Sequence, residues 1–442
     1  MSKRRIEEQI AAAELSRREF LAGLAAATGA LAIGGCGNAS SSDPENDPLP
    51  NPADSGIEHV VVLMMENRSY DHFFGWVPGA DGMQSGLEFV DKQGATQQTY
   101  PLAPEFQGCA DGDPDHSYNG GRTQFAGGAN DGWLLASTSD NFPIGFYEAK
   151  DLSFFGGAVP QWTIFDRYFC AIMSSTYPNR MYMHTGQTDR LSNTLTASTL
   201  PAIWDRLASA GLSGTYYYGD LPVTALFGSR FLPISKPYAQ FLADAAAGTL
   251  SNVTYIDPHF ISEDLGTSND DHPFADIRNG QVLINEVYDA ITRSPNWENT
   301  VLVVNYDEWG GFFDHVPPPL APQTEQDPII GNDGRLGFRT PTLLVSPLAR
   351  RGFVAHQQYD HTSILSMIEW RWGLDPLTVR DATANNIARA LDFKSGKDLS
   401  VPRFAVPQGP FGEACVMNDA VRAESRGLRE MALQYGFTLP PR

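Results

Sequence analysis

The segment VVLMMENRSYDHFFG, from Val61 to Gly75, decides the fold. It opens with a continuous apolar run, which is typical of a strand buried on both faces of a parallel sheet. The run ends in Glu66 and Asn67. Polar side chains that directly follow a buried strand lie at the rim of the sheet, where open α/β folds bind their ligands. We therefore predict that a strand over 59–65 delivers side chains to a functional site.

Three further apolar segments predict strands of the same kind: TYIDP (254–258), TVLVVNYD (300–307) and TPTLLVS (340–346). Helical patterns lie between and after them, in LPAIWDRLASAG (200–211), YAQFLADAAAG (238–248), FADIRNGQVLINEVYDAITRS (274–294) and TSILSMIEWRWG (362–373). Strands that alternate with helices predict a doubly wound α/β fold, in which a mostly parallel central sheet is covered by helices.

The strand over 300–307 also ends in acidic residues, Asp307 and Glu308. Together with Glu66 and Asn67, these residues bring four oxygen-bearing side chains to one rim of the sheet. Such ligands suit a hard divalent cation, Ca²⁺, Mg²⁺ or Mn²⁺, better than a soft one. Acidic residues also cap strands where they meet solvent, so either pair alone would be weak evidence.

The segment SSTYPNRMYMHTG (174–186) contains the candidate nucleophile, Thr176. Pro178 favours the first turn of a helix, so the threonine hydroxyl is expected near a helix N-terminus, where backbone amides favour an anion. A hydroxyl next to a metal loses its proton more readily and can attack phosphorus. The alternative is that Ser175 or Thr176 simply caps the helix.

Five of the nine histidines directly follow an aspartate: His72, His116, His272, His315 and His361. A carboxylate near an imidazole raises its pKa and fixes its tautomer, which suits phosphate binding or proton donation. Adjacent residues of an extended segment point in opposite directions, however, so a role in a loop or a helix cap is equally compatible with each pair. The segment DHTS in particular predicts a helix cap at Asp360 and His361.

The overall charge excludes some functions. The chain of 442 residues has a formal net charge of -21, which argues against a nucleic-acid-binding protein.

The sequence has no G-x-x-x-x-G-K-[ST] phosphate loop, no H-E-x-x-H zinc helix, no G-x-S-x-G nucleophile elbow and no Cys-x-x-Cys spacing. Hydrolysis of an ester by another type of site stays open.

The first residues form an export signal. SRREFL (16–21) fits the pattern read by the twin-arginine export machinery, and a short apolar stretch follows it. IGGC (33–36) resembles a lipobox, so we expect residues 1–36 to be a signal peptide with a lipid anchor at Cys36, or a plain cleaved signal. Either predicts an exported protein, periplasmic or on the cell surface.

The rest of the chain divides in two. Residues 37–56 are rich in Ser, Asn, Asp and Pro and predict a flexible linker, and residues 57–442 read as a single catalytic domain. Beyond the signal, Cys109, Cys170 and Cys415 permit at most one internal disulfide and leave one thiol over.

Six segments resemble, in order, the signature blocks of the bacterial phosphoesterase family that contains phospholipases C and acid phosphatase A. They are ENRSYDHFFG, TYPNRMYMHTG, NDDHP, YDEWGGFFDHVPPP, GFRTPTLLVSPLAR and YDHTSILSMIEWRWG, and they span approximately residues 57 to 375. The resemblance implies an alkaline-phosphatase-like α/β fold, in agreement with the sheet predicted above.

The resemblance also implies roles for single residues. Glu66, Asn67, Asp307 and Glu308 would bind one divalent metal ion, and Thr176 would be the nucleophile. Asn67, Arg180, His116 and His272 would bind the phosphate ester, with the two histidines holding phosphoryl oxygens or protonating the leaving group. Many relatives have Asp-Asp where this chain has Asp307-Glu308.

The expected function is therefore a metal-dependent phosphoesterase that acts through a phosphothreonyl intermediate, of the phospholipase C type. Two alternatives stay open: a phosphomonoesterase of the acid phosphatase type and a noncatalytic surface lipoprotein. TYPNR has the spacing of the sulfatase segment C-x-P-x-R, whose first residue is oxidised to an aldehyde. Threonine cannot form that aldehyde, so phosphate is favoured over sulfate.

Overall fold

The computed structural model describes residues 43–136, 141–261, 267–415 and 419–440. The predicted signal peptide, with its twin-arginine segment and Cys36, lies outside the described residues. Within them, no helix has the length and apolar character needed to cross a membrane.

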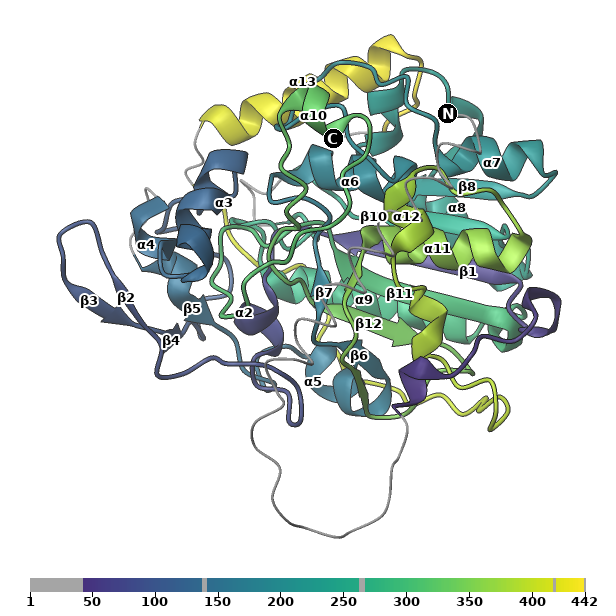
Figure 1. The fold of residues 1–442 in the computed structure, drawn as a ribbon, viewed down its shortest axis with the longest axis horizontal. Coiled ribbons are helices and arrows are strands. Elements are labelled where there is room, and N and C mark those ends of the chain that lie inside the picture. The colour runs from purple at the N-terminus through teal and green to yellow at the C-terminus, as the bar shows by residue number, and fades with distance from the viewer. Residues whose placement is uncertain (1–42, 137–140, 262–266, 416–418, 441–442) are drawn as a thin grey trace, which may run out of the picture.

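A central sheet of eight strands organises the molecule (Figure 1). Its order is β13 (Phe353–Ala355), β6 (Thr163–Phe165), β12 (Thr342–Val345), β11 (Thr300–Tyr306), β1 (His59–Met65), β10 (Val253–Asp257), β8 (Gly214–Tyr218) and β9 (Ser235–Pro237). The predicted α/β fold with a mostly parallel central sheet is confirmed. Strand β12 runs antiparallel to β11 and β6. An apolar run is the same in either direction, so the sequence does not contain this detail.

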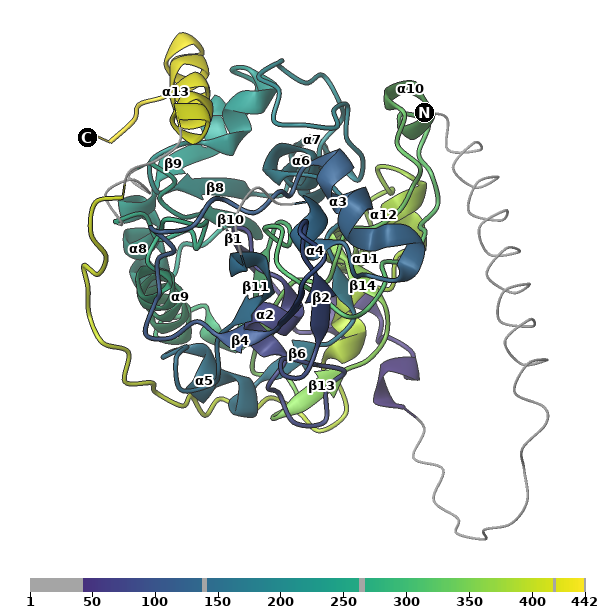
Figure 2. The same ribbon diagram turned by 90° about the vertical axis from the view of Figure 1, so that its left-hand side faces the viewer.

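Helices cover both faces of the sheet. In Figure 2, α8 (Tyr238–Ala247) and α9 (Ile277–Thr292) lie on one face, and α6 (Thr176–Thr185), α7 (Ile203–Ser209) and α11 (His361–Trp372) on the other. The shorter helices are α2 (Tyr70–Phe74), α3 (Tyr118–Phe125), α4 (Trp133–Ala136), α5 (Phe155–Ala158), α10 (Asp327–Ile330) and α12 (Val379–Thr383), and α13 (Asp419–Gln434) follows near the C-terminus. Three small sheets pair β2 (Glu88–Val90) with β3 (Thr96–Gln98), β4 (Tyr100–Pro101) with β5 (Gly145–Phe146), and β7 (Tyr168–Phe169) with β14 (Tyr359–Asp360).

The described part of the predicted linker, residues 43–56, packs against the domain. It contains two short 3-10 helices, Pro44–Asn46 and Pro52–Asp54. Between these turns and the domain, the buried Glu45 carboxylate accepts hydrogen bonds from the His356 backbone amide at 2.7 Å and from the Tyr359 hydroxyl at 2.6 Å. The polar composition of this stretch suggested a flexible linker. The contacts that hold it could not be foreseen, because the partners of Glu45 lie more than 300 residues away in the sequence.

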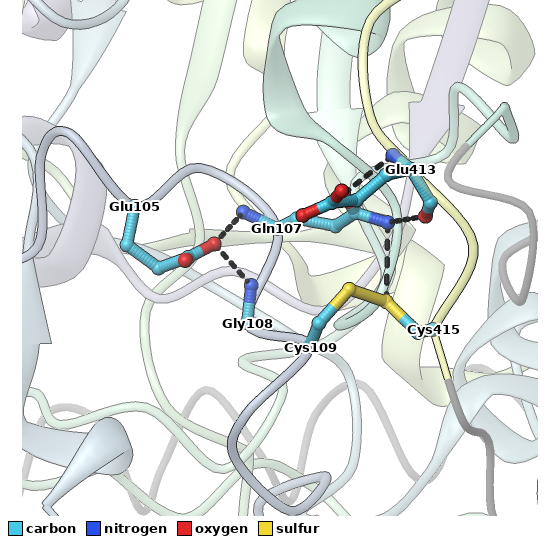
Figure 3. Close-up of a disulfide and its surroundings, with 6 residues drawn as sticks. All are labelled: Glu105, Gln107, Gly108, Cys109, Glu413 and Cys415. Carbon is cyan, nitrogen blue, oxygen red and sulfur yellow. Dashed lines mark hydrogen bonds between the residues drawn. A yellow bond between two sulfur atoms is a disulfide. The ribbon is translucent and has the colours of Figure 1, made fainter.

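One disulfide joins Cys109 to Cys415, which are 306 residues apart, and Cys170 is a buried free thiol. The sequence permitted at most one internal disulfide with one thiol left over, and the structure contains that one disulfide and that one thiol. The bond fastens the C-terminal segment to the loop of Cys109 (Figure 3). Further along the chain, this loop leads to Asp113 and His116.

Candidate active site

The ends of β1 and β11 bring the four predicted metal ligands together. The two strands pair in parallel, with Met65 opposite Tyr306, so the residues that follow each strand are neighbours. The Asp307 amide donates to the Met65 carbonyl at 3.1 Å, and the Asn67 amide donates to the Asp307 carboxylate at 3.3 Å. The parallel register thus places Glu66 and Asn67 beside Asp307 and its neighbour Glu308.

The backbone at this rim is unusually tight. Asn67 has a φ of 61°, in the left-handed region that few side chains favour. Gly310, with a φ of 64°, passes so close that a Cβ placed on it would lie 2.1 Å from the Asn67 carbonyl oxygen. Only glycine fits there, which explains the first glycine of the YDEWGG segment.

Two buried oxygens at this rim have no hydrogen-bond partner among the described residues, Asn67 Oδ1 and Glu308 Oε1. Both residues are fully buried, and burial raises the pKa of Asp307 and raises that of Glu308 to about 8. Buried carboxylates and lone amide oxygens are costly without a compensating cation. The donor set therefore fits one hard divalent ion held by Glu66, Asn67, Asp307 and Glu308.

Arg180 lies underneath this group, where it pairs with three carboxylates. Its guanidinium donates to Asp307 Oδ2 at 3.0 Å and to Asp257 Oδ1 at 2.8 Å, and it lies 3.3 Å from Glu66 Oε1. The side chain is 2% exposed. These contacts hold the acidic side chains in place, and a contact between Arg180 and the substrate stays a prediction.

Thr176 is the first residue of α6, one turn before Arg180 and on the same helix face. It is buried, at 6% exposure. The bend before it is fixed by Asn179, which accepts from the Ile172 amide at 3.1 Å and donates to the Ser174 carbonyl at 2.7 Å. Ser175 occupies the N-cap position, but its side chain makes no capping hydrogen bond. Since Arg180 reaches Asp307, α6 lies against the rim of the sheet.

His116 and His272 meet beside Asn67, with ring centroids 5.8 Å apart. The backbone explains why: the Glu66 amide donates to the Asp270 carbonyl at 2.8 Å, which aligns the loop of His272 with the end of β1. His116 reaches the same place from another loop, with Nε2 3.5 Å from Asn67 Nδ2. Burial lowers the pKa of His272, and the carboxylate of Asp113 opposes that shift.

The sequence interpretation missed Asp113. Its carboxylate lies 3.9 Å from a ring nitrogen of His116 and 3.9 Å from one of His272, so the three form a compact group. The adjacent Asp-His pairs of the sequence include Asp115, which directly precedes His116, but not Asp113. The available signal was the spacing of three residues in DPDH, which lets a turn bring Asp113 back to His116.

A second group of acidic residues and a histidine consists of Asp71, Asp314 and His315. A buried arginine balances the negative charge of its two carboxylates. The fully buried Arg339 donates to Asp314 at 3.0 Å and to Asp71 at 3.1 Å. His315 also pairs with Asp71. These contacts make the group an internal ion network between the segment after β11 and α2.

The two remaining Asp-His pairs are structural. His72 donates from Nδ1 to the Gly145 carbonyl at 2.7 Å and is fully buried. Asp360 caps α11 as predicted, accepting from the Thr362 amide at 2.6 Å. His361 has a further contact, because its Nε2 donates to the Asp307 carbonyl at 2.7 Å and so supports the backbone of the rim.

A family model for the Phosphoesterase family matches residues 57–375. The chain belongs to that family. Its members act on phosphate esters, so the protein is a hydrolase of phosphoric ester bonds.

Among named relatives, it is 31% identical to phospholipase C B of Mycobacterium tuberculosis, over 89% of each chain. It is also 31% identical to non-specific phospholipase C1 of Arabidopsis thaliana, over 81% of this chain and 75% of the plant protein. Among solved structures, it is similar to a protein of the alkaline phosphatase superfamily from Vibrio parahaemolyticus, with 10% identity and a TM-score of 0.38 over 86% of this chain and 87% of that chain.

Proposed function

We propose that this protein is an exported, metal-dependent phosphoesterase of the phospholipase C type, which cleaves phosphodiesters of phospholipid head groups through a phosphothreonyl intermediate. The observation that carries the proposal is the pair of buried oxygens, Asn67 Oδ1 and Glu308 Oε1, that lack partners among the described residues. At the same rim, Asp307 accepts from Arg180 of the helix that begins with Thr176. The names of the bacterial and plant relatives support the substrate class.

The chemistry needs a positive charge where the phosphoryl oxygens bind. A divalent ion held by Glu66, Asn67, Asp307 and Glu308 would neutralise those oxygens and make a nearby hydroxyl more acidic. The Thr176 oxygen then bonds to phosphorus while the bond to the alcohol breaks, and water releases the phosphorylated head group in a second displacement. Each displacement inverts phosphorus, so the product retains its configuration.

The two histidines bind the phosphoryl group from the other side. Nδ1 of His116 donates to the Pro114 carbonyl at 2.8 Å, and Nδ1 of His272 donates to the Pro273 carbonyl at 3.0 Å. A carbonyl oxygen only accepts, so these bonds make Nδ1 the protonated nitrogen and fix the orientation of both rings. When the rings are charged, Nε2 donates to a phosphoryl oxygen or protonates the leaving alcohol, and the Asp113 carboxylate favours that charged form.

Export is part of the proposal. It is supported by the predicted signal over residues 1–36 and by the Cys109–Cys415 disulfide, since disulfides persist mainly in oxidising compartments outside the cytosol. Cell fractionation of the wild type and of Cys36→Ala tests it. A membrane-bound wild type with a released variant supports a lipid anchor, and a cytosolic wild type contradicts export.

A panel of three chromogenic esters tests the activity. Nitrophenyl phosphorylcholine, nitrophenyl phosphate and nitrophenyl sulfate are each incubated with wild type and Thr176→Ala, with and without chelator. We expect chelator-sensitive turnover of the first compound by wild type alone. Turnover of nitrophenyl phosphate alone would select the phosphomonoesterase, and no turnover would select the noncatalytic lipoprotein. Sulfate turnover that survives the alanine change would refute the chemistry.

A further inference from the structure

The C-terminal segment 409–415 is bound to the loop that leads to His116, although it lies beyond the residues that match the family model. The Gln107 side chain donates to the Glu413 carbonyl at 2.6 Å and accepts from the Glu413 amide at 3.0 Å (Figure 3). Two residues further, the disulfide joins Cys109 to Cys415. The segment is therefore fixed to this loop by a covalent bond and a two-point amide clamp.

The same loop holds the His272 segment. The Gln107 carbonyl accepts from the Phe274 amide at 3.0 Å, two residues after His272. Phe274 has a φ of 83°, a strained conformation for an aromatic residue that the surrounding contacts must maintain. Gln107 thus connects three segments that are far apart in sequence: the C-terminal segment, its own loop and the turn behind His272.

In the other direction, the loop leads directly to the second histidine. Asp113 and His116 follow Cys109 by four and seven residues. The far end of this stretch is held independently, because Gln124 of α3 donates to the Asp115 carbonyl at 2.6 Å. The near end is held by the Glu105 carboxylate, which accepts from the Gln107 and Gly108 amides at 2.8 Å and 2.9 Å, and by the Gln107 side chain and the disulfide. Together these contacts set how Asp113 and His116 approach His272.

We propose that Gln107 and the Cys109–Cys415 disulfide are positioning elements for the His116–His272 pair, so that the enzyme reaches full activity only when oxidised. The inference rests on the proposed phosphoesterase function. Oxidation removes one proton and one electron from each thiol and forms the sulfur–sulfur bond. A protein or small-molecule disulfide takes up the two electrons and two protons and is cleaved to two thiols. Cytosolic thiols stay reduced, so the catalytic geometry is completed after export.

Kinetics of three variants test the proposal under conditions where circular dichroism shows each to be folded. Cys109→Ser/Cys415→Ser and Gln107→Met are expected to lower kcat on the order of 100-fold, the usual effect of misplacing catalytic groups by about 1 Å. KM is expected to change by less than about threefold. Reductant is expected to lower the kcat of wild type in the same way and to leave the double serine variant unchanged.

Asn279 provides a matched control. Its side chain clamps the same segment with the same two bonds, donating to the Phe411 carbonyl at 3.2 Å and accepting from the Phe411 amide at 2.9 Å. It lies on α9, so this clamp joins the segment to that helix and not to the loop of Gln107. Asn279→Leu is therefore expected to lower stability and keep kcat. An equal loss of kcat in Asn279→Leu and Gln107→Met would overturn the proposal, as would a double serine variant with wild-type kcat.

A readout without turnover separates this inference from the proposed function. Ring signals of ¹⁵N-labelled His116 and His272, assigned with single glutamine variants, are compared between oxidised and reduced protein. We expect both sets to shift on reduction while the signals of His72 stay in place. Unchanged ring signals would overturn the positioning role even if the enzyme is active, and a shift in a protein without esterase activity would support it while the proposed function fails.

Discussion

Replacing Arg180 with methionine removes a buried cation from among three carboxylates, Asp307, Asp257 and Glu66. Removing one partner of a buried ion pair typically costs about 3–5 kcal/mol, because the other charge stays buried. Although Arg180 pairs with three carboxylates, the loss of stability is not three times that of a single ion pair. Burial already raises the pKa of Asp257 to about 7, so that carboxyl takes up a proton near neutral pH once the guanidinium is gone. We expect the free energy of unfolding to fall by about 4 kcal/mol at pH 8.

The loss in the free energy of unfolding can be measured as a fall in the melting temperature, Tm. An unfolding entropy of about 2.1 cal/mol/K per residue gives about 0.8 kcal/mol/K for a domain of roughly 390 residues, so Tm is expected to fall by about 5 °C. Arg180→Lys keeps the charge but not the forked geometry, and about half of that loss is expected. At pH 5 the losses of stability of both variants, Arg180→Met and Arg180→Lys, are expected to be smaller. Protonated carboxyl groups carry no charge for the cation to neutralise.

Two results would refute this reasoning about Arg180. A loss below about 1 kcal/mol at pH 8 would mean that the guanidinium does not neutralise the buried acids. A higher KM with unchanged Tm would leave Arg180 only the role expected from the sequence, that of a substrate contact.

Three further predictions concern the nucleophile, the metal ligands and the disulfide. Thr176→Ala is expected to lower kcat on the order of 1,000-fold or more and Thr176→Ser by less than about tenfold, measured with nitrophenyl phosphorylcholine; an active alanine variant would exclude Thr176 as nucleophile. Burial raises the pKa of Glu308 to about 8, above its ordinary value of 4.5, so the folded metal-free chain holds this proton more tightly than the unfolded chain. Its contribution to stability is thus complete below pH 4.5 and is lost as the pH rises through about 8. Urea unfolding with chelator is expected to show a steeper decline in wild type than in Glu308→Gln, where Asp257, with a pKa of about 7, still contributes. Cys109→Ser/Cys415→Ser is expected to lower the free energy of unfolding by about 5 kcal/mol, because the bond closes a long loop in the unfolded chain, and a change below about 1 kcal/mol in urea unfolding would contradict this.

The sequence predicted the parts of the site that follow directly from strand ends. Apolar runs located β1 and β11, and their parallel register then placed Glu66 and Asn67 beside Asp307, so one local pattern and one rule of sheet topology were enough. Asn67 Oδ1 and Glu308 Oε1, buried oxygens without a partner among the described residues, are the kind of local inconsistency that marks functional sites.

Other parts were not accessible from the sequence because they depend on packing between distant segments. The role of Arg180 follows from β10 ending in Asp257 directly beneath α6, which no local pattern records. Asp113 faces two histidines only because separate loops converge on them. The pairing of Cys109 with Cys415 over 306 residues could not be chosen from three cysteines.

The covalent step tests the central claim most directly. Wild-type enzyme is mixed with nitrophenyl phosphorylcholine, quenched in acid within the first turnover and mapped by peptide mass spectrometry. We predict that the phosphorylcholine mass is found on the peptide that contains Thr176, at this residue, and that chelator abolishes it. Phosphorylcholine on a different side chain, or turnover with inverted configuration at phosphorus and no adduct, would contradict the account.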